Sequence, residues 1–281
     1  MVKGLLSFLL LFSSLIADDI LVIEEENPLT SKIKSFVDIE VYDTNSEFIK
    51  IIFSPASDYY ENERVNAVKV VSTLKANGLL KLFFEKPQEI NLHFKTAGSS
   101  LFFVKLMSDT LRNIGYYRYV TTASNLNSSE FIWSISLTSE YATDPVVLQK
   151  ELAKQGCKII DIYRNSSNDW TYVVDMQAGY LNVPILKNAK TINLKRSLYA
   201  HWLNTSKIKN LRITSSVRNN WYPYIAYYDK SLHLLKVIKK DEKHQRINLK
   251  IPKCAKYIKI SDIYTLKNIK DNLTLYPTGI R

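Results

Sequence analysis

Histidine and serine side chains are the first to test for chemistry in this chain of 281 residues. Its four histidines are His93, His201, His233 and His244, and none forms a metal-ligand pattern with a second histidine, a cysteine or a carboxylate. Serine followed three residues later by lysine occurs at residues 31–34, 72–75 and 206–209, as expected by chance in a lysine-rich chain. Gly-x-Ser-x-Gly, HExxH and phosphate-loop motifs are absent. We therefore expect no catalytic residue, no metal and no cofactor, and predict that the protein is not an enzyme.

Two cysteines, Cys157 and Cys254, complete the set of reactive side chains. In an oxidising compartment they would form a disulfide that joins the middle of the chain to its C-terminal part across a long loop. The alternative is that both are small buried apolar side chains, as free cysteines often are. The sequence leaves both readings open.

An aromatic run at residues 221–228 is the strongest candidate for binding. If it is a strand, Trp221 and Ile225 point into a core and the tyrosines between them point outward. Outward aromatic rings would form a stacking platform for a sugar or a protein, or would pack beneath a neighbouring module. The candidate ligand-binding residues are Tyr222, Tyr224, Tyr228 and Lys230.

Positive charge is concentrated in the C-terminal third. The formal net charge is +11, but residues 177–281 hold 21 Lys and Arg against 5 Asp and Glu, net +16, while the preceding residues hold 17 against 22, net −5. The split indicates a surface for anionic partners such as acidic proteins, lipid headgroups, lipopolysaccharide or acidic glycans. Two alternatives stay open: solvated strands whose outward positions are lysine, and attraction between the two halves, within one chain or between copies.

The N-terminus has the pattern of a secretory signal peptide. A lysine precedes an apolar stretch at residues 5–16, and Ala17 stands before Asp18 and Asp19, so we predict cleavage after Ala17. No later apolar run approaches 18 residues, which predicts a mature chain without a transmembrane span. Export also argues against a nucleic-acid partner for the basic region.

Composition adds a weak resemblance. The chain is rich in Lys, Asn, Ile, Leu and Tyr and has only 7 glycines. Together with the short signal, this resembles the exported proteins of campylobacter-type bacteria. The resemblance implies a periplasmic location.

Three segments of the N-terminal part share one pattern, a helix closed by Leu-x-x-x-Gly and followed by two strand-like runs. The helical patterns cover residues 62–78, 99–115 and 144–156. The paired runs are residues 79–84 with 90–95, 116–120 with 131–137, and 158–163 with 170–174, and a further strand is expected at 48–53. The pattern predicts tandem small modules, each a helix packed on an antiparallel sheet.

The C-terminal part contains short strand-like runs and no convincing helix. The runs cover residues 207–214, 221–228, 232–238, 246–251, 256–260 and 273–276. Apolar and polar residues alternate cleanly at 246–251, and spacings of about ten residues are typical of a β-sandwich.

One resemblance rests on three of these runs. Residues 221–229 (WYPYIAYYD), 256–262 (KYIKISD) and 273–276 (LTLY) follow one another in an order similar to a galactose-binding-like jelly-roll domain. This resemblance covers residues 198–277 and implies recognition of sugars or of the cell surface in some relatives and a structural role in others.

The predicted fold class is therefore α+β, with tandem helix-on-antiparallel-sheet modules followed by a C-terminal β-sandwich of jelly-roll type. The expected division is a signal peptide (1–17), a first module (18–97), second and third modules (98–180) and a basic sandwich (181–281). The favoured function is a non-enzymatic periplasmic scaffold or assembly protein of the cell envelope, accessory to a surface machine such as the flagellar motor. The alternative is a protein that binds carbohydrate or lipopolysaccharide through the sandwich. Expected partners are envelope proteins or an anionic glycan or lipid surface, with a homo-oligomer left open.

Overall fold

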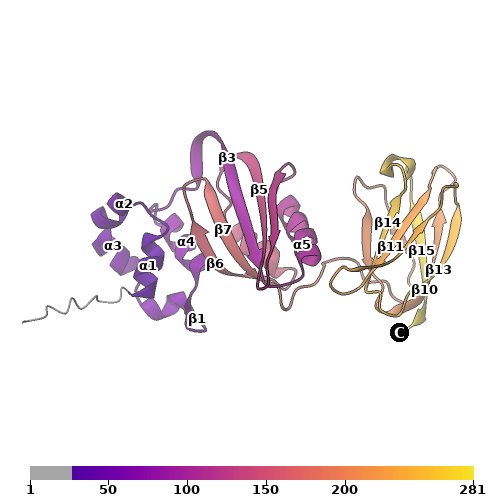
Figure 1. The fold of residues 1–281 in the computed structure, drawn as a ribbon, viewed down its shortest axis with the longest axis horizontal. Coiled ribbons are helices and arrows are strands. Elements are labelled where there is room, and N and C mark those ends of the chain that lie inside the picture. The colour runs from indigo at the N-terminus through magenta and orange to yellow at the C-terminus, as the bar shows by residue number, and fades with distance from the viewer. Residues whose placement is uncertain (1–26) are drawn as a thin grey trace, which may run out of the picture.

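The computed structural model describes residues 27–281 and arranges them in three parts along one axis (Figure 1). Short helices lie at one end, a five-stranded sheet with two helices lies in the middle, and two packed four-stranded sheets lie at the other end. The α+β fold class is confirmed. The predicted signal peptide and its cleavage after Ala17 lie outside the described residues. Within residues 27–281, no helix is long and apolar enough to cross a membrane.

The N-terminal part is helical, with one small hairpin. Its elements are α1 (Pro28–Lys34), α2 (Ile39–Thr44), α3 (Ser46–Ile52), the 3₁₀ helix η1 (Ala56–Tyr59), β1 (Tyr60–Glu61), β2 (Arg64–Val65) and α4 (Ala67–Ala76). Asn27 and Asn66 begin α1 and α4, because the side-chain oxygen of each accepts a backbone N–H of the first turn.

Two local predictions for this part are wrong. The strand expected at residues 48–53 is instead helical in α3, because Ile49 and Phe53 are buried at a spacing of four residues, which fits one helix face rather than one strand face. The helix expected from Asn62 begins later, at α4. Asn62 and Glu63 have positive φ values of 47° and 65°, and they turn the β1–β2 hairpin.

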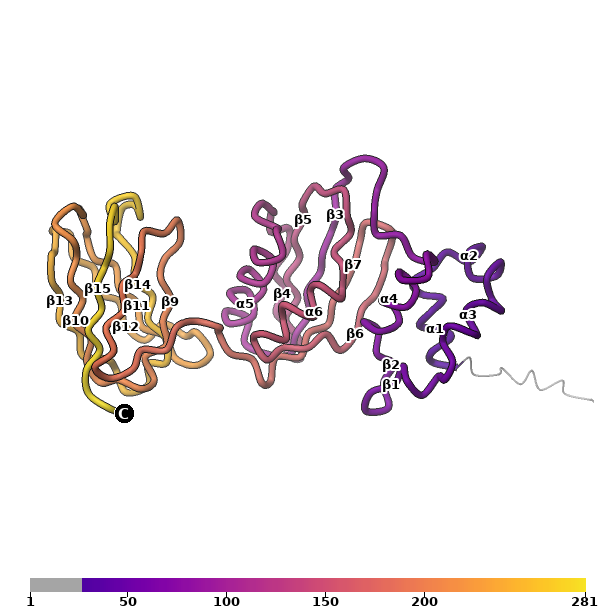
Figure 2. The backbone as a smooth tube through the Cα atoms, turned by 180° about the vertical axis from the view of Figure 1, so that it is seen from behind, coloured from indigo at the N-terminus to yellow at the C-terminus, as the bar shows by residue number. Residues whose placement is uncertain are grey.

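The middle part is one mixed sheet with the strand order β4-β5-β3-β7-β6. Its elements are β3 (Phe83–Thr96), α5 (Ser100–Asn113), β4 (Val120–Leu126), β5 (Phe131–Tyr141), α6 (Pro145–Ala153), β6 (Lys158–Arg164) and β7 (Asp169–Asp175). All pairs are antiparallel except β3 with β7, which run parallel. Helices α5 and α6 lie on the same face of this sheet (Figure 2).

The three predicted helix–hairpin units do not form three separate sheets. β7 of the third unit pairs with β3 of the first, so the strands of all three units share the five-stranded sheet. The hairpin expected in the first unit is also wrong, since β3 continues through Pro87 as one strand with an irregular register between Phe83 and Gln88. Proline donates no hydrogen bond to a ladder, and the irregularity accommodates it without a chain reversal.

The predicted helix boundaries of the second and third units are confirmed. Helix α5 begins after Ser99, and the Asp144 side chain accepts the Val146 N–H at 2.9 Å to cap α6. Gly115 and Gly156 follow these helices with φ of 103° and 70°, the left-handed region in which glycine ends a helix without strain.

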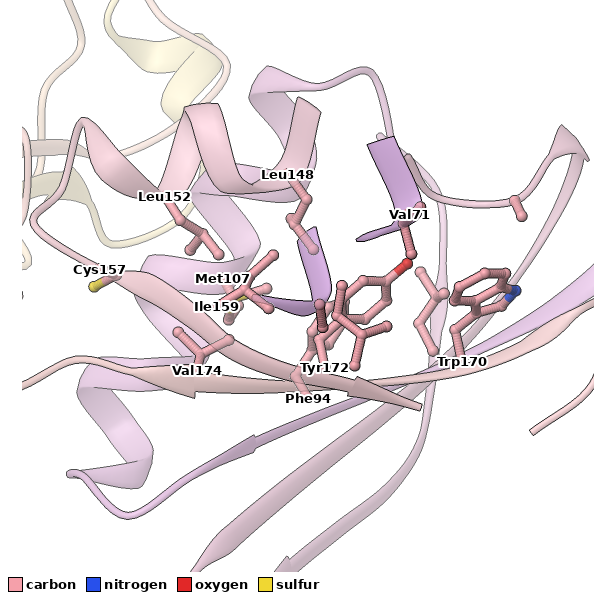
Figure 3. Close-up of a cluster of buried hydrophobic side chains, with 14 of the residues drawn as sticks. Val71, Phe94, Met107, Leu148, Leu152, Cys157, Ile159, Trp170, Tyr172 and Val174 are labelled. Atoms are coloured by element: carbon pink, nitrogen blue, oxygen red, sulfur yellow. The ribbon is translucent and has the colours of Figure 1, made fainter. Parts of the chain in front are cut away.

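The core of the middle part lies between the sheet and helices α4, α5 and α6 (Figure 3). Phe94 and Tyr172 stack at its centre with ring centroids 5.7 Å apart. The Tyr172 hydroxyl donates a 2.8 Å hydrogen bond to the Thr143 carbonyl, so this fully buried polar atom is satisfied. Leu148 and Leu152 of α6 close the core from the helix side.

The C-terminal part is a β-sandwich, as predicted. Its elements are β8 (Ile192–Leu194), β9 (His201–Asn204), β10 (Ile208–Ser215), β11 (Pro223–Tyr228), β12 (Leu234–Lys239), β13 (Arg246–Lys250), β14 (Tyr257–Asp262), the 3₁₀ helix η2 (Leu266–Asn268) and β15 (Leu273–Ile280). Trp221 and Ile225 are fully buried between the two sheets, which confirms the predicted inward face.

The strand pairing of this sandwich is that of a jelly roll. One sheet has the order β13-β10-β15-β8 and the other β12-β11-β14-β9. The first strand therefore pairs with the last, the second with the second to last, and so on inward to the hairpin β11–β12, and each of these pairs is antiparallel. Strands β8 and β9 have three and four residues, too few for the sequence pattern to reveal them.

Direct contacts join the jelly roll to the middle part. The Ser99 hydroxyl at the start of α5 donates to the Ser231 carbonyl at 3.0 Å, and the Tyr257 hydroxyl accepts the Leu181 N–H at 3.3 Å. Leu232 and Tyr257 are 4% and 1% exposed and belong to the core of the middle part, although both lie in the jelly-roll sequence. We call this contact region the joint.

Candidate functional site

The three tyrosines of the predicted platform lie in β11 or directly before it but do not form one surface. Tyr222 packs edge-on against Tyr264, with ring centroids 5.1 Å apart. Tyr228 lies at the joint against Trp202 of β9, with ring centroids 4.9 Å apart. Tyr224 lies between them and remains partly exposed. The predicted platform is therefore divided, with one tyrosine at the joint, one in a side pair and one available on the open sheet.

Lysines surround the available ring. Lys239 of β12 and Lys259 of β14 lie opposite Tyr224 and Ala226 in the ladder, and their ammonium groups are 5.5 Å and 5.9 Å from the centre of the Tyr224 ring. Lys259 is also 5.9 Å from the Trp202 ring. Cations at these distances are attracted to the negative face of an aromatic ring. We call Trp202, Tyr224, Lys239 and Lys259 the Lys–Tyr face.

Helix α5 contributes a further cation to this face. The ammonium of Lys105 is 5.3 Å from the Trp202 ring and forms a 2.5 Å ion pair with Asp109. Burial lowers the pKa of Lys105, Asp109 opposes this shift, and the nearby charges of Arg112 and Lys259 add to the lowering. Positive groups thus gather here at an energetic cost. Sequence reasoning missed Lys105 because the joint brings it to Trp202 from a distant part of the chain.

Lys230, the fourth predicted site residue, lies away from the Lys–Tyr face. It lines a groove of about 1100 Å³ that runs from the jelly roll to the end of the five-stranded sheet. Two lysines of this groove are neutralised, because Lys95 pairs with Glu130 at 3.8 Å and Lys158 pairs with Glu61. Lys230 has no carboxylate oxygen of the described residues within 4.0 Å.

The Lys and Arg side chains of the jelly roll lack carboxylate partners among the described residues. In the part of the chain that the structure describes, no Lys or Arg of residues 177–281 forms an ion pair with a carboxylate; the jelly roll's one such contact joins His233 to Asp229 at 2.9 Å. Lys and Arg of the preceding parts form ion pairs repeatedly, as in Lys32 with Asp161 at 2.5 Å and Arg164 with Asp38 at 3.1 Å. The positive charge of the C-terminal third is therefore uncompensated on its own surface.

Asp262, one of the five carboxylates in residues 177–281, holds loops of the jelly roll. Asp262 is 7% exposed and accepts the backbone N–H groups of Tyr222 at 2.8 Å and Tyr264 at 2.9 Å. It also accepts the Thr265 N–H and the Asn268 side-chain amide, both at 3.0 Å. The Asp262 oxygens are therefore occupied by backbone and amide donors and are not available to the lysines.

A polar cluster that sequence reasoning missed lies on the open face of the five-stranded sheet. His93 Nδ1 is 2.7 Å from the Ser134 hydroxyl, and His93 Nε2 is 3.3 Å from a carboxylate oxygen of Asp169. This is the set of groups that acyl-transfer enzymes use, but Ser134 is 5% exposed and lies in the interior strand β5, whose backbone groups pair with β3 and β4. Strand β5 therefore offers no free backbone N–H beside Ser134 to stabilise an oxyanion, and the geometry of the cluster fits a structural network.

The two cysteines are free thiols, so the disulfide that the sequence left open is not formed. Cys157 is buried beside Gly179 before β6, whereas Cys254 is exposed in a turn of the jelly roll. The two positions belong to different parts of the molecule. Burial raises the pKa of the Cys157 thiol to about 11, with a smaller contribution from Asp175, so this thiol is protonated and unreactive at neutral pH.

Within residues 27–281, no group of three or more His, Cys, Asp and Glu side chains is placed to hold a metal ion. The fold and the surface together describe an α+β protein with a basic jelly roll. Searches against family models, curated proteins and solved structures found no match.

Proposed function

We propose that the protein is a non-enzymatic scaffold or assembly component of the bacterial cell envelope, exported to the periplasm after cleavage behind Ala17 and accessory to a surface machine such as the flagellar motor. Its jelly roll would dock on an acidic envelope protein through the Lys–Tyr face. The observation that carries this proposal is the absence, among the described residues, of any ion pair between a Lys or Arg of residues 177–281 and a carboxylate.

Unpaired surface cations favour an anionic partner for a physical reason. The net charge of +16 in residues 177–281 creates a positive potential that acidic surfaces would reduce on contact. Screening limits this field to about 8 Å at physiological ionic strength, so the partner must approach the lysines closely. Such attraction mainly raises the association rate and selects the partner, while packing on rings such as Tyr224 supplies contact area.

The joint supports a scaffold role. Because Leu232 and Tyr257 are buried in the core of the middle part, the jelly roll is held against that part by packing as well as by hydrogen bonds. A rigid connection lets a non-enzymatic protein present two surfaces at a constant separation. That property is what an assembly component needs.

The second candidate is a protein that binds carbohydrate or lipopolysaccharide. It is favoured by one detail of the Lys–Tyr face, the placement of Tyr224 between the ammonium groups of Lys239 and Lys259. The ring would stack on the apolar side of a sugar, and the lysines would bind its phosphate or carboxylate groups.

The deciding experiment is cross-linking in living cells followed by affinity purification of the full exported chain. We expect recovery of envelope proteins with the wild type and at least a tenfold loss in the double variant Lys239→Glu/Lys259→Glu. The matched control is Lys81→Glu/Lys150→Glu, which makes the same charge change at exposed positions outside the jelly roll. Recovery of no envelope protein, with retention on a glycan array, would instead support the carbohydrate alternative.

Location is tested separately by cell fractionation and N-terminal sequencing. A periplasmic chain that begins at Asp18 is expected. A cytoplasmic chain that retains Met1 would contradict the export proposal, whatever the jelly roll binds.

A further inference from the structure

Strand β4 is an open edge of the five-stranded sheet. In the described residues it pairs with β5 on one side only, and its side chains are exposed on both faces, with Val120 at 67% and Leu126 at 70%. Its sequence, Val-Thr-Thr-Ala-Ser-Asn-Leu, contains neither the charges nor the proline that protect exposed edges. The register shifts between Thr121 and Ala123, which leaves residues 123–126 as a regular edge.

The opposite edge of this sheet and two edges of the jelly roll are closed or charged. Helix α1 covers β6, since Lys32 donates to the Ile162 carbonyl at 2.9 Å, and Arg164 donates back to the Phe36 carbonyl at 3.1 Å. Edge strands β12 and β13 of the jelly roll carry exposed basic residues such as Lys236 and Lys250. Among these edges, β4 is the one without a protective device.

A groove of about 980 Å³ lies at the N-terminal end of β4, and its lining includes Val120 and Thr122 of that strand. Tyrosine and arginine dominate the rest of the lining: Tyr116, Tyr117, Tyr119, Tyr199, Arg112 and Arg118. These residue types supply much of the binding energy in protein interfaces. Arg112 is already paired with Asp109, whereas Arg118 is exposed and has no carboxylate partner among the described residues.

One segment of this chain has matching chemistry. Residues 18–26, Asp-Asp-Ile-Leu-Val-Ile-Glu-Glu-Glu, lie outside the described residues and consist of four aliphatic residues between acidic groups at both ends. The aliphatic run has the length of the regular edge at residues 123–126. Because both ends are acidic, either strand direction brings a carboxylate toward Arg118. We propose that residues 18–26 of a second copy add as a strand to β4 and place a carboxylate at Arg118.

A second copy is the appropriate donor because of where the segment joins the fold. Asn27 caps α1, which packs beside β6, and Figure 2 shows α1 and β4 on opposite sides of the sheet. Each copy then has a donor segment at one side and an acceptor edge at the other. Such head-to-tail contacts generate a ring of copies where the rotation between them closes and an open filament where it does not. This inference is independent of the docking role proposed for the Lys–Tyr face.

Sedimentation velocity of the full chain with its own N-terminal segment tests the inference. We expect sedimentation coefficients that rise with concentration and association about tenfold weaker in Arg118→Glu. The same loss is expected in one of two end variants, Asp18→Lys/Asp19→Lys or Glu24→Lys/Glu25→Lys/Glu26→Lys, according to which end faces Arg118. Combining Arg118→Glu with that end variant should restore association. Arg246→Glu is the matched control at an exposed position of β13. Hydrogen exchange should show added protection of amides in β4 on association.

Three outcomes would overturn the inference. The first is a chain that stays monomeric at every concentration, and the second is association without added protection in β4. The third is loss of association in Lys239→Glu/Lys259→Glu but not in Arg118→Glu, which would place the acidic segment on the Lys–Tyr face. These measurements do not require the Lys–Tyr face to capture a partner. Failure of the proposed function and failure of this inference can therefore be told apart.

Discussion

Two open sheet faces in this molecule differ in how their polar groups are satisfied. On the five-stranded sheet, His93 contacts Ser134 and Asp169, and Asp169 also accepts the Asn165 amide at 2.7 Å. On the jelly-roll sheet, Lys239 and Lys259 face aromatic rings and have no carboxylate partner among the described residues. The chemically capable residues of one face are thus held by hydrogen bonds within the fold, whereas the lysine charges of the other face stay available for contacts on the surface.

The largest expected effect tests whether the two regions are separate folding units. Trp221→Ala removes a fully buried side chain of the jelly-roll core, whose indole N–H donates to the Ser261 carbonyl at 2.9 Å. We expect the jelly roll to lose about 3–5 kcal/mol of stability, while hydrogen exchange in β3 and β7 stays near wild type. Trp170→Ala is the matched change in the other core. Equal loss of protection in both regions for either variant would show that the regions unfold as one unit.

The next effect tests whether the jelly-roll carboxylates are structural. Asp262→Ala leaves backbone donors of Tyr222 and Tyr264 without their acceptor, so we expect a loss of about 2–3 kcal/mol in chemical denaturation. Glu242→Ala, at an exposed position, makes the same charge change and should alter stability little. Similar losses in the two variants would mean that net charge, rather than hydrogen bonding, sets jelly-roll stability.

A smaller effect tests the His93 network on the five-stranded sheet. His93→Ala removes the centre of the network on the five-stranded sheet, which we expect to cost about 1 kcal/mol. Partner capture in the cross-linking experiment should be unchanged, in contrast to the loss expected for the Lys–Tyr face. Loss of capture without loss of stability in His93→Ala would assign a functional role to this network and break the distinction drawn above.

The smallest effect concerns thiol reactivity and its pH dependence. At neutral pH a thiol reagent should label Cys254 alone, because Cys157 is buried with its pKa raised to about 11. A folded-state pKa above the ordinary value of 9.0 means that the unfolded chain loses this proton first, so the Cys157 contribution to stability falls as pH rises from 9.0 toward about 11. Cys157→Ala should remove this part of the alkaline loss, as measured by urea denaturation. Rapid labelling of Cys157 in the folded chain at neutral pH would contradict its burial.

Local signals in the sequence predicted local structure well. Ser99 and the Asp144-Pro145 pair fixed the starts of α5 and α6, and alternation at residues 246–251 identified β13. However, the glycines that end the repeated Leu-x-x-x-Gly pattern lie in different tertiary surroundings. A Cβ on Gly156 would lie 2.4 Å from the Ala178 carbonyl oxygen, whereas one on Gly78 would meet nothing within 4 Å.

The pairing of strands that are distant in sequence could not be predicted. This pairing determines the sheet of the middle part and the surroundings of the candidate site. The parallel pair of β3 with β7 turns three apparent modules into one sheet, yet no residue pattern specifies which distant strand β3 selects. The same limit hid the candidate site. Tyr224 was visible in the aromatic run, but its neighbour Lys259 depends on the β11–β14 register and Lys105 depends on the joint.

The joint also has a mechanical consequence. Tyr257 belongs to the jelly roll in sequence but packs in the core of the middle part. Tilting the jelly roll against the middle part would therefore expose this almost fully buried aromatic ring to water. A pull on the Lys–Tyr face would therefore be transmitted to the middle part as a torque rather than absorbed by a slack linker. Under the proposed scaffold role, tension between the two ends of the molecule would load the Tyr257 contact before it loaded either sheet.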